Sequence, residues 1–479
     1  MAKKVEKLAT FINTTFFSYD KSQQILIENS FEDNPDNDKQ QKIDAINKIC
    51  EKITKNEMSS ASLQDKKEYF HIASFDYFKL KRTEQNELIY KIDNINGNYF
   101  ISTGLYCGVI NFGDKLPQLE IKIGYSDIFF KRILNFCCGI YADTNTTKNT
   151  SEGESIYSLL IQYLFLVSLR KVAAKSIPKR YVYLQGRGYN INGNVDIERY
   201  VSHDLFSSDK MVTYQYPAYL EIQNIVDVLY SAMKCCKINT KDTILPNLKE
   251  FEHYLDELYS GVRPSRKIIN ASLKDKCLRN SLYSDYKKPL EYARILLSSN
   301  DLNSGDSKSI SGISGFLVDA SFLWEMYLYN LMRLHLRDWS IDAQCEISFY
   351  EDDFYSKKNY PDFVLRNKST GKIFILDAKF KSMNYENFDV DNDDIRQLHS
   401  YSYYFSLTEK ENFCGAALIY PSKMSKPDDC KNVDNIFGIK SSGCKFGVFS
   451  VKDPNHDEKE TITENETKFI DELKAFIEN

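Results

Sequence analysis

Apolar and polar positions change their spacing along the chain, and each change predicts a different kind of element. Residues 99–124 are rich in β-branched and aromatic residues punctuated by glycine, which predicts several short strands. Residues 125–142 have apolar positions at helical spacing, as do residues 43–53, and both segments are predicted to be helices. We therefore expect residues 1–150 to form a mixed β and helical region.

A helix-rich region is predicted next. Apolar residues recur at helical spacing over residues 154–174 and again over much of residues 217–300, and the first of these faces is most simply a core face. Basic residues gather at 170–189, where tyrosines interleave with them, and at 263–279. The first basic stretch suits contact with phosphates and stacked bases, and it suits a solvated helix end followed by an ordinary strand equally well.

Serine, glycine, asparagine and aspartate are dense over residues 298–315, which predicts a linker. We place a domain boundary there, between a helix-rich middle region at 151–305 and a third domain at 306–479. Within the third domain, Phe316–Leu336 has the apolar stripe of a helix, and residues 345–350 are predicted to form a short strand-like run.

The bulk composition is that of a folded soluble protein. With 479 residues the chain is too long for one core, so two or three domains are expected. None of its 11 cysteines falls in a C-x-x-C pair, which indicates reduced thiols rather than a zinc ribbon. The most apolar long run, Ile156–Leu169, is too short to cross a bilayer, and the N-terminus has no sustained apolar core. We expect a cytoplasmic protein with no membrane partner.

The net charge of −5 does not by itself indicate a nucleic-acid-binding protein. It conceals an asymmetry, because residues 311–479 are net acidic and residues 1–310 are net basic. A metal-dependent nuclease can have this distribution, with carboxylates at its metal site and phosphate binding delegated to another domain. Two ordinary solvated surfaces would also explain it.

The sequence becomes specific at residues 360–381, which read YPDFVLRNKSTGKIFILDAKFK. Two apolar strand patterns flank a polar turn that contains Gly371, which predicts an antiparallel hairpin. Side chains alternate across a strand, so Asp377 and Lys379 share one face, and the hairpin can bring Asp362 beside Asp377. We expect two carboxylates and one ammonium to converge at the edge of a sheet.

This trio predicts metal-dependent hydrolysis of a phosphodiester. Carboxylate oxygens are the ligands that Mg²⁺ prefers, and Mn²⁺ is an alternative. A cation bound by Asp362 and Asp377 would polarise a scissile phosphate and lower the pKa of a bound water. Lys379 would position that water and offset the negative charge that develops on phosphorus.

The spacing of these residues resembles that of the PD-(D/E)XK nuclease superfamily, with 14 residues between Asp362 and Asp377 and a D-A-K ending to the second strand. The resemblance implies that Glu325, in the preceding helix, joins the metal site. It also implies that Gln397 and Tyr401, four residues apart on the helix after the hairpin, lie near the active site. A helix-surface carboxylate and two ordinary polar helix residues are the alternatives.

Further landmarks resemble the McrC family, the nuclease subunit of McrBC-type modification-dependent restriction systems. Residues 116–124, LPQLEIKIG, are similar to a family strand, although the proline that precedes the lysine in the family is missing before Lys122. Residues 188–201 resemble a later family strand. Residues 320–332 resemble a family helix, with Trp324 where the family has phenylalanine.

This resemblance spans residues 100–421 and is strongest at 316–405. It implies an α+β multidomain protein, with a mixed β and helical N-terminal region that docks on a partner and a C-terminal α/β domain of the PD-(D/E)XK restriction-endonuclease type. It also implies that the chain cuts DNA in an anti-phage complex and stimulates a hexameric AAA+ GTPase. The sequence has no G-x-x-x-x-G-K-[ST] phosphate loop, so the motor would be the partner.

Two other functions stay open on the sequence. A stand-alone PD-(D/E)XK nuclease of repair or defence would need the same hairpin but no GTPase. A non-catalytic DNA-binding scaffold subunit would tolerate the loss of its acidic residues, yet Asp362, Asp377 and Lys379 are all present. A neighbouring AAA+ gene would distinguish the restriction subunit from the stand-alone enzyme.

Overall fold

The computed structural model of the chain forms two compact units. One combines Met1–Thr150 with Lys308–Asn479, and the other is Ser151–Ser307. The division places the predicted first and third regions in one unit, and the second unit nearly coincides with the predicted middle region. The residues that the structure describes are 7–11, 47–48, 50–53, 57–59, 70–72, 87–95, 98–112, 118–137, 156–236, 246–302, 314–349, 358–381, 390–423, 444–454 and 461–478.

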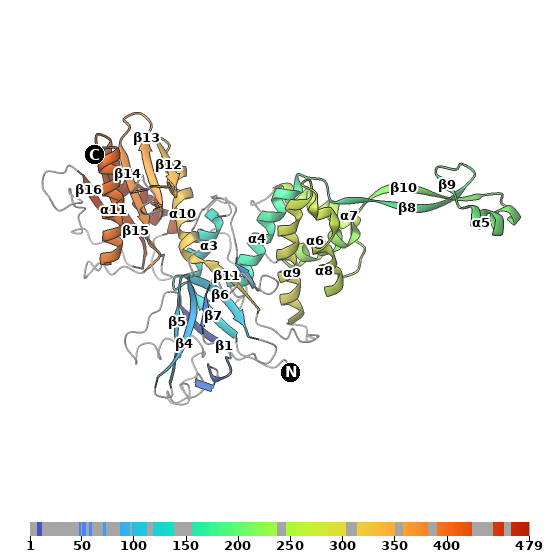
Figure 1. Cartoon of the computed structure of the whole chain (residues 1–479), viewed down its shortest axis with the longest axis horizontal. Helices are drawn as coiled ribbons and strands as arrows, with labels where there is room; N and C mark the ends of the chain where they lie inside the picture. Colours follow the sequence, from blue (N-terminus) through green and yellow to red (C-terminus); the bar gives the residue numbers. More distant parts are fainter. Residues whose placement is uncertain are drawn as a thin grey trace. The chain divides into compact units, whose positions relative to one another are not determined.

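The first unit contains the sheet that carries the predicted hairpin (Figure 1). Its five strands lie in the order β12-β13-β14-β15-β16. Their bounds are Trp339–Ala343 for β12, Phe363–Asn367 for β13, Ile373–Ala378 for β14, Phe413–Ser422 for β15 and Lys445–Lys452 for β16. Strands β12, β13 and β14 are antiparallel neighbours, whereas β14, β15 and β16 are parallel. The continuous apolar runs of β14 and β15 are typical of strands covered on both faces.

Helices cover both faces of this sheet. They are α10 (Ala320–His335), α11 (Asn392–Thr408) and α12 (Ile462–Glu478). Helix α11 packs through Leu398 into a buried cluster that includes Ile375 of β14. The neighbouring residue of β14, Phe374, points to the opposite face and contacts Phe476 of α12, with ring centroids 5.5 Å apart. Asp377 and Lys379 lie on the face that α11 covers, because they are two and four residues after Ile375 and side chains alternate between the faces of a strand.

The N-terminal part of the first unit adds two more sheets and a helix. One sheet has the strand order β1-β7-β6-β11-β3, and the other has the order β2-β4-β5. The strands are β1 Lys7–Phe11, β2 Glu57–Ser59, β3 Phe70–Ile72, β4 Leu88–Ile95, β5 Asn98–Thr103, β6 Tyr106–Asn111, β7 Gln118–Lys122 and β11 Ser314–Asp319. Helix α3 (Asp127–Cys137) packs against α10. The short strands predicted within residues 99–124 and the helix that follows them are confirmed.

The predicted helix Phe316–Leu336 begins later than expected. Residues 314–319 form strand β11, which pairs antiparallel with β6, so the assignment of Phe316 to a helix was wrong. The helix starts where Asp319 caps it, because the Asp319 side chain accepts hydrogen bonds from the backbone N–H groups of Ser321 and Phe322. The apolar residues directly before the cap fit the spacing of a helix and that of a strand equally well. Their strand partner, β6, lies about two hundred residues earlier in the chain, so a local pattern could not reveal it.

Two segments of the first unit that are far apart in sequence are joined by a buried ion pair. The guanidinium of Arg132 in α3 donates from Nε and Nη2 to the two carboxylate oxygens of Glu466 in α12, at 2.9 and 2.8 Å. The hydroxyl of Tyr327 in α10 donates to the same carboxylate at 2.9 Å. A bidentate arrangement with a further donor is the geometry in which burial of a charged pair is compensated. Three helices from both segments of the unit therefore share one polar contact.

The second unit is helical, with a long two-stranded ribbon. Its helices are α4 Ile156–Ala173, α5 Ile197–Ser202, α6 Gln223–Cys235, α7 Pro246–Leu258, α8 Arg266–Leu273 and α9 Lys287–Leu302, with short 3-10 turns η2 Asp204–Phe206, η3 Lys276–Arg279 and η4 Ser284–Tyr286. Strands β8 (Lys179–Gly188) and β10 (Val212–Glu221) form the ribbon, and the two-residue strand β9 (Asn194–Val195) pairs with β10. In Figure 1 the ribbon extends away from helices α6–α9 and carries α5 at its far end.

The ribbon and its end carry exposed aromatic and apolar side chains. Tyr181, Tyr183 and Tyr189 of the first predicted basic stretch are at least 70% exposed. At the far end, Phe206 is 79% exposed and Ile197 is 72% exposed. Exposed apolar groups that gather in this way are typical of contact surfaces in soluble proteins. The sequence patterns did not predict the ribbon.

Other expectations need correction or lie outside the described residues. Of the predicted strand at 345–350, the described residues 345–349 form no strand but a single bridge between Ile347 and Asn359. The predicted linker at 298–315 is helical up to Leu302 and extended from Ser314, and the residues between lie outside the described part. Of the predicted helix at 43–53, only part is described. Among the described residues, no helix combines the length and the apolar character that crossing a membrane requires.

Candidate active site

The hairpin of β13 and β14 brings the two predicted acids to the same end. Its register pairs Phe363 with Leu376, which places Asp362 opposite Asp377. The backbone N–H of Ala378 donates to Asp362 Oδ2 at 2.7 Å. The turn at the other end contains Gly371 in a left-handed conformation, with φ +73°. The predicted hairpin is therefore confirmed, together with the proximity of its acids.

Lys379 lies beside these acids, as the alternation of side chains predicts. Its Nζ is 2.6 Å from Asp377 Oδ2 in an ion pair. The Asp377 side chain is fully buried, and its Oδ1 has no hydrogen-bond donor within the described residues. A buried carboxylate oxygen without a donor is costly, and such atoms in a folded protein call for a functional explanation.

The titration behaviour of the three groups follows from burial and mutual charge. Burial, together with the charges of Glu325 and Asp377, raises the pKa of Asp362 well above its usual range. Burial also raises the pKa of Asp377, although the ammonium of Lys379 opposes this shift. Burial alone would lower the pKa of Lys379, but the carboxylates of Asp377 and Asp362 outweigh it and the pKa is raised. Lys379 thus stays cationic, while the acids repel one another.

Glu325 of α10 reaches this cluster through a residue that the sequence patterns did not reveal. Its side chain is only 7% exposed, which excludes the helix-surface alternative. The side-chain amide of Gln344, just after β12, donates from Nε2 to Glu325 Oε2 at 2.9 Å and to Asp362 Oδ1 at 3.1 Å. No local pattern marks Gln344, because its partners come from a helix and a strand elsewhere in the chain.

The two predicted polar residues of α11 form a chain of hydrogen bonds that ends on the lysine. Lys379 Nζ donates to Gln397 Oε1 at 2.8 Å, and Gln397 Nε2 donates to the Tyr401 hydroxyl at 2.7 Å. That hydroxyl donates in turn to the backbone carbonyl of Tyr360 at 3.4 Å. Burial raises the pKa of Tyr401 to about 12, so the phenol stays neutral. The structure therefore brings Gln397 and Tyr401 to the site.

A second lysine with acidic partners lies next to this cluster and was also missed. Lys381 Nζ is 2.8 Å from both Asp391 Oδ2 and Asp394 Oδ2. The Tyr420 hydroxyl of β15 donates to the same Asp394 oxygen at 2.9 Å. Strand alternation places Lys381 in step with Lys379, which is the signal that could have found it. The contribution of β15 could not be foreseen from local spacing.

Asp362 and Asp377 are the residues that could hold a metal ion. Two neighbouring carboxylates, one with an undonated buried oxygen, fit a hard cation such as Mg²⁺ or Mn²⁺. The described residues contain no group of three or more His, Cys, Asp and Glu side chains already arranged to hold a metal. Glu325, the expected third ligand, is linked to Asp362 through the side-chain amide of Gln344.

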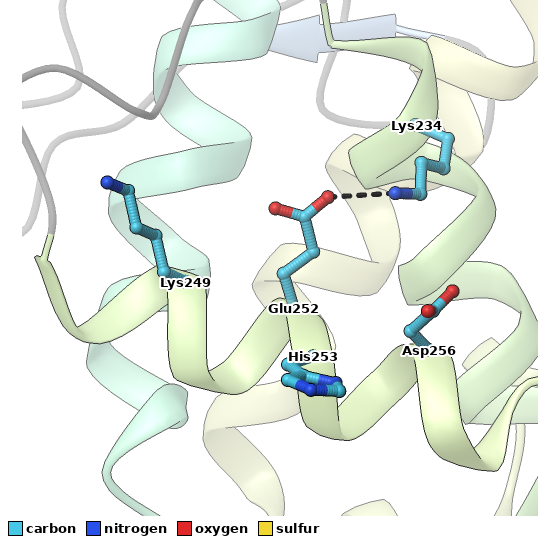
Figure 2. A pocket seen from close by; sticks show the side chains of 5 residues that line it. All are labelled: Lys234, Lys249, Glu252, His253 and Asp256. Carbon is cyan, nitrogen blue, oxygen red and sulfur yellow. Dashed lines mark hydrogen bonds and ion pairs between the residues drawn. The ribbon is translucent and has the colours of Figure 1, made fainter.

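A pocket in the second unit contains none of the predicted site residues (Figure 2). It has a volume of about 350 Å³ and is lined by Lys234, Lys249, Glu252, His253 and Asp256. Figure 2 shows Glu252 directed toward Lys234, and the two form an ion pair of 3.0 Å. Asp256 accepts a hydrogen bond from the Tyr230 hydroxyl. Three of the charged lining residues, Lys234, Glu252 and Asp256, are therefore already engaged with neighbours.

The predicted basic stretch at 170–189 is partly neutralised. Lys179 pairs with Glu221 at 2.9 Å, and Arg187 pairs with Asp209 at 3.1 Å. Lys175 pairs with Asp285. Much of the basic charge that suggested phosphate binding is therefore balanced locally, while the tyrosines remain exposed.

Comparisons with known proteins identify a family and similar solved structures. The family model for "McrBC 5-methylcytosine restriction system component" matches residues 101–421. A refined half-complex from a tetradecameric assembly of Thermococcus gammatolerans McrB AAA+ hexamers with bound McrC contains a chain that is 16% identical, with a TM-score of 0.47 and with 86% of this chain and 91% of that chain covered. The McrBC complex of the same organism contains a chain that is 15% identical, with a TM-score of 0.28 and with 57% and 78% covered. No curated protein matches the sequence.

Proposed function

Because this chain belongs to the family of McrBC 5-methylcytosine restriction system components, we propose that it is the subunit that cuts DNA in such a system. It is a Mg²⁺-dependent endonuclease that hydrolyses phosphodiester bonds, and its β12–β16 sheet with helices α10, α11 and α12 is a PD-(D/E)XK domain. The observation that carries the proposal is the convergence of Asp362, Asp377 and Lys379 at one end of the hairpin. A scaffold subunit would have no use for a buried, undonated carboxylate oxygen.

The acids of the hairpin supply the metal site. Asp362 and Asp377 would hold Mg²⁺, which when bound polarises the scissile phosphate and lowers the pKa of a bound water. Mn²⁺ would serve in the same place. Glu325 is the third acid of the site, held at Asp362 by the intervening amide. The backbone N–H of Ala378 fixes the orientation of the Asp362 carboxylate.

Lys379 acts on the phosphate and on the attacking water. An ammonium has three donors, of which Asp377 and Gln397 occupy two within the described residues. The third can donate to a phosphate oxygen as negative charge develops there, or hold the water in line. Because the carboxylates raise the pKa of Lys379, the donor stays charged at neutral pH. Tyr401 acts indirectly, since it orients the Gln397 amide.

The partner is a hexameric AAA+ GTPase that moves DNA to this site. The similar Thermococcus structure is an assembly of McrB AAA+ hexamers with bound McrC. The chain itself lacks a phosphate loop, so hydrolysis of GTP falls to the other subunit. The mixed region at 1–150 is the part that we expect to dock on the GTPase and to stimulate it.

A cleavage assay tests this function. Plasmid DNA with and without 5-methylcytosine is incubated with the chain, with Mg²⁺ or with EDTA, and with or without the AAA+ GTPase and GTP. We expect cleavage only with Mg²⁺, and only when the GTPase and GTP are present. Cleavage that persists in EDTA would reject the metal-dependent mechanism. Equal cleavage without the GTPase would identify a stand-alone nuclease of repair or defence.

A further inference from the structure

Gln344 combines an unusual backbone conformation with an unusual side-chain position. It follows directly after Ala343, the last residue of β12, and its φ is +53°. This left-handed conformation is disfavoured for a residue with a long side chain, and glycine or asparagine adopts it more readily. Its backbone N–H donates to the carbonyl oxygen of Asp362 at 3.0 Å, which fixes the backbone at this point. A disfavoured backbone that the surroundings hold in place is a pointer to function.

The side chain of Gln344 connects two acids of the active site. One amide nitrogen carries two hydrogens, and it lies 2.9 Å from Glu325 Oε2 and 3.1 Å from Asp362 Oδ1. Asp362 Oδ2 accepts from the Ala378 N–H at 2.7 Å, so donors on both oxygens set the plane of this carboxylate. The amide is neutral, and it therefore holds two repelling carboxylates together without cancelling the charge that attracts a cation.

We propose that Gln344 is a positioning residue that holds Glu325 and Asp362 at the spacing in which both serve one divalent cation. The proposal rests on the metal-dependent function proposed above and deepens it. Groups that hydrogen-bond to metal ligands fix the orientation of those ligands, and their loss typically weakens metal affinity about 10- to 100-fold. Gln344 does not touch the reacting atoms; it acts through the two acids.

The strained backbone makes a positioning role separable from a structural role. Replacement of Gln344 by glycine removes the side-chain amide and relieves the left-handed backbone. If the role of Gln344 were purely structural, loss of its two hydrogen bonds would lower the melting temperature and leave metal binding intact. A positioning residue would lose metal affinity while the melting temperature is kept.

The test measures Mn²⁺ binding to the full chain by the loss of the free-ion electron paramagnetic resonance signal. We expect Gln344→Gly to weaken Mn²⁺ affinity at least about 10-fold with no fall in melting temperature. Gln344→Asn tolerates the same backbone but is one methylene shorter, so it cannot reach both acids and should be weakened similarly. Lys210→Gly is the matched control, because Lys210 has φ +52° and belongs to the other unit. It should bind Mn²⁺ as the wild type does.

Two outcomes would overturn the proposal in different ways. If wild-type protein binds Mn²⁺, Asp377→Ala loses it, and Gln344→Gly and Gln344→Asn keep wild-type affinity, the positioning role is rejected while the metal-dependent function stands. If the wild type and Asp377→Ala bind Mn²⁺ equally or not at all, the proposed function and the positioning role fall together.

Discussion

Asp362 carries the strongest electrostatic conflict among the residues of the site. Its carboxylate accepts hydrogen bonds on both oxygens, yet it also lies near Glu325 and Asp377, and its pKa is raised well above the usual range. A carboxylate near ammonium Lys379 alone would have the opposite shift. The positive charge of Lys379 therefore does not offset the repulsion among the acids, and a bound divalent cation would offset it.

This conflict predicts how the stability of the metal-free protein depends on pH. Unfolded aspartate has a pKa of about 3.9, and the folded pKa of Asp362 is higher, so the native state binds more protons between the two values. The contribution of Asp362 to the free energy of unfolding should be most favourable below about pH 4, and it should fall as the pH rises toward the folded pKa. The loss amounts to about 1.4 kcal/mol for each pH unit that separates the folded pKa from the unfolded pKa.

Melting temperatures in EDTA across this pH range, for the wild type and for Asp362→Asn, check the expectation. The substitution removes the titrating group, so the variant should lose less stability with rising pH than the wild type does. Parallel pH profiles for the two proteins would show that Asp362 is not under the inferred repulsion.

Strand alternation and the shortness of the hairpin predict the positions of three site residues from the sequence. Asp377 and Lys379 share a face because they are two residues apart on one strand, and Asp362 is opposite because the hairpin is short. Gln344 and Lys381 escaped notice for a common reason. Their partners are supplied by other elements. Nothing in the sequence around Gln344 signals a left-handed backbone, and strand alternation gives the face of Lys381 but not its acidic partners.

The hairpin is the element that sets the geometry of the site, and its turn depends on Gly371. The Cβ of an alanine there would meet only the side chain of Asn412, at 3.4 Å from Oδ1, which is an ordinary contact. The cost of the substitution therefore comes from the left-handed backbone, with φ +73°. We expect Gly371→Ala to lower the free energy of unfolding by about 1–2 kcal/mol, measured by urea denaturation. Gly371→Asn should cost less, because asparagine tolerates this conformation. Both variants should keep Mg²⁺-dependent cleavage, because the turn is at the end of the hairpin away from Asp362. Loss of cleavage in either variant, while the protein stays folded, would contradict this expectation.

Helix α11 contributes the chain of hydrogen bonds behind Lys379. Tyr401→Phe removes the hydroxyl that accepts from Gln397, so Gln397 should orient Lys379 less well. One such bond is worth about 0.5–1.5 kcal/mol, and we expect cleavage to fall about 2- to 10-fold. Tyr403→Phe is the matched control, because Tyr403 on the same helix is 58% exposed. Equal rates for both variants in the plasmid assay would show that Tyr401 plays no part in orienting the lysine.

Elements whose partners are local could be predicted from the sequence, whereas an element whose partner is distant in the chain could not. The hairpin was predicted from its own spacing. Strand β11 was taken for the start of a helix because its partner, β6, lies far back in the chain. Residues 345–350 look like a strand, yet only Ile347 forms a bridge there among the described residues.

At the scale of the whole molecule, the first unit is assembled from two chain segments that enclose the second unit in sequence. Composition marked the boundary near residue 305 but could not show that the first and third regions share a unit. The contact of Arg132, Glu466 and Tyr327 is one of the links between these segments, and both members of the ion pair are almost fully buried.

Breaking this buried pair should destabilise the first unit. Glu466→Ala leaves the guanidinium of Arg132 buried without its carboxylate partner, which typically costs about 3–5 kcal/mol. Glu472→Ala, which removes an exposed carboxylate from the same helix, should cost at most about 1 kcal/mol. Thermal and urea unfolding of both variants measure the difference, and a Glu466→Ala protein as stable as Glu472→Ala would contradict the link.

The proposed cleavage activity of the whole molecule depends on the ammonium of Lys379 beside Asp377. Two lysine variants of the hairpin test this dependence in the Mg²⁺-dependent cleavage assay with the GTPase and GTP. Lys379→Ala removes that ammonium, and Lys372→Ala removes the same side chain at the opposite end of the hairpin. We expect Lys379→Ala to lose about 10²- to 10³-fold in rate, as Asp377→Ala does, while Lys372→Ala cuts normally. Cleavage by Lys379→Ala and Asp377→Ala at the rate of Lys372→Ala would show that the phosphodiester is hydrolysed elsewhere.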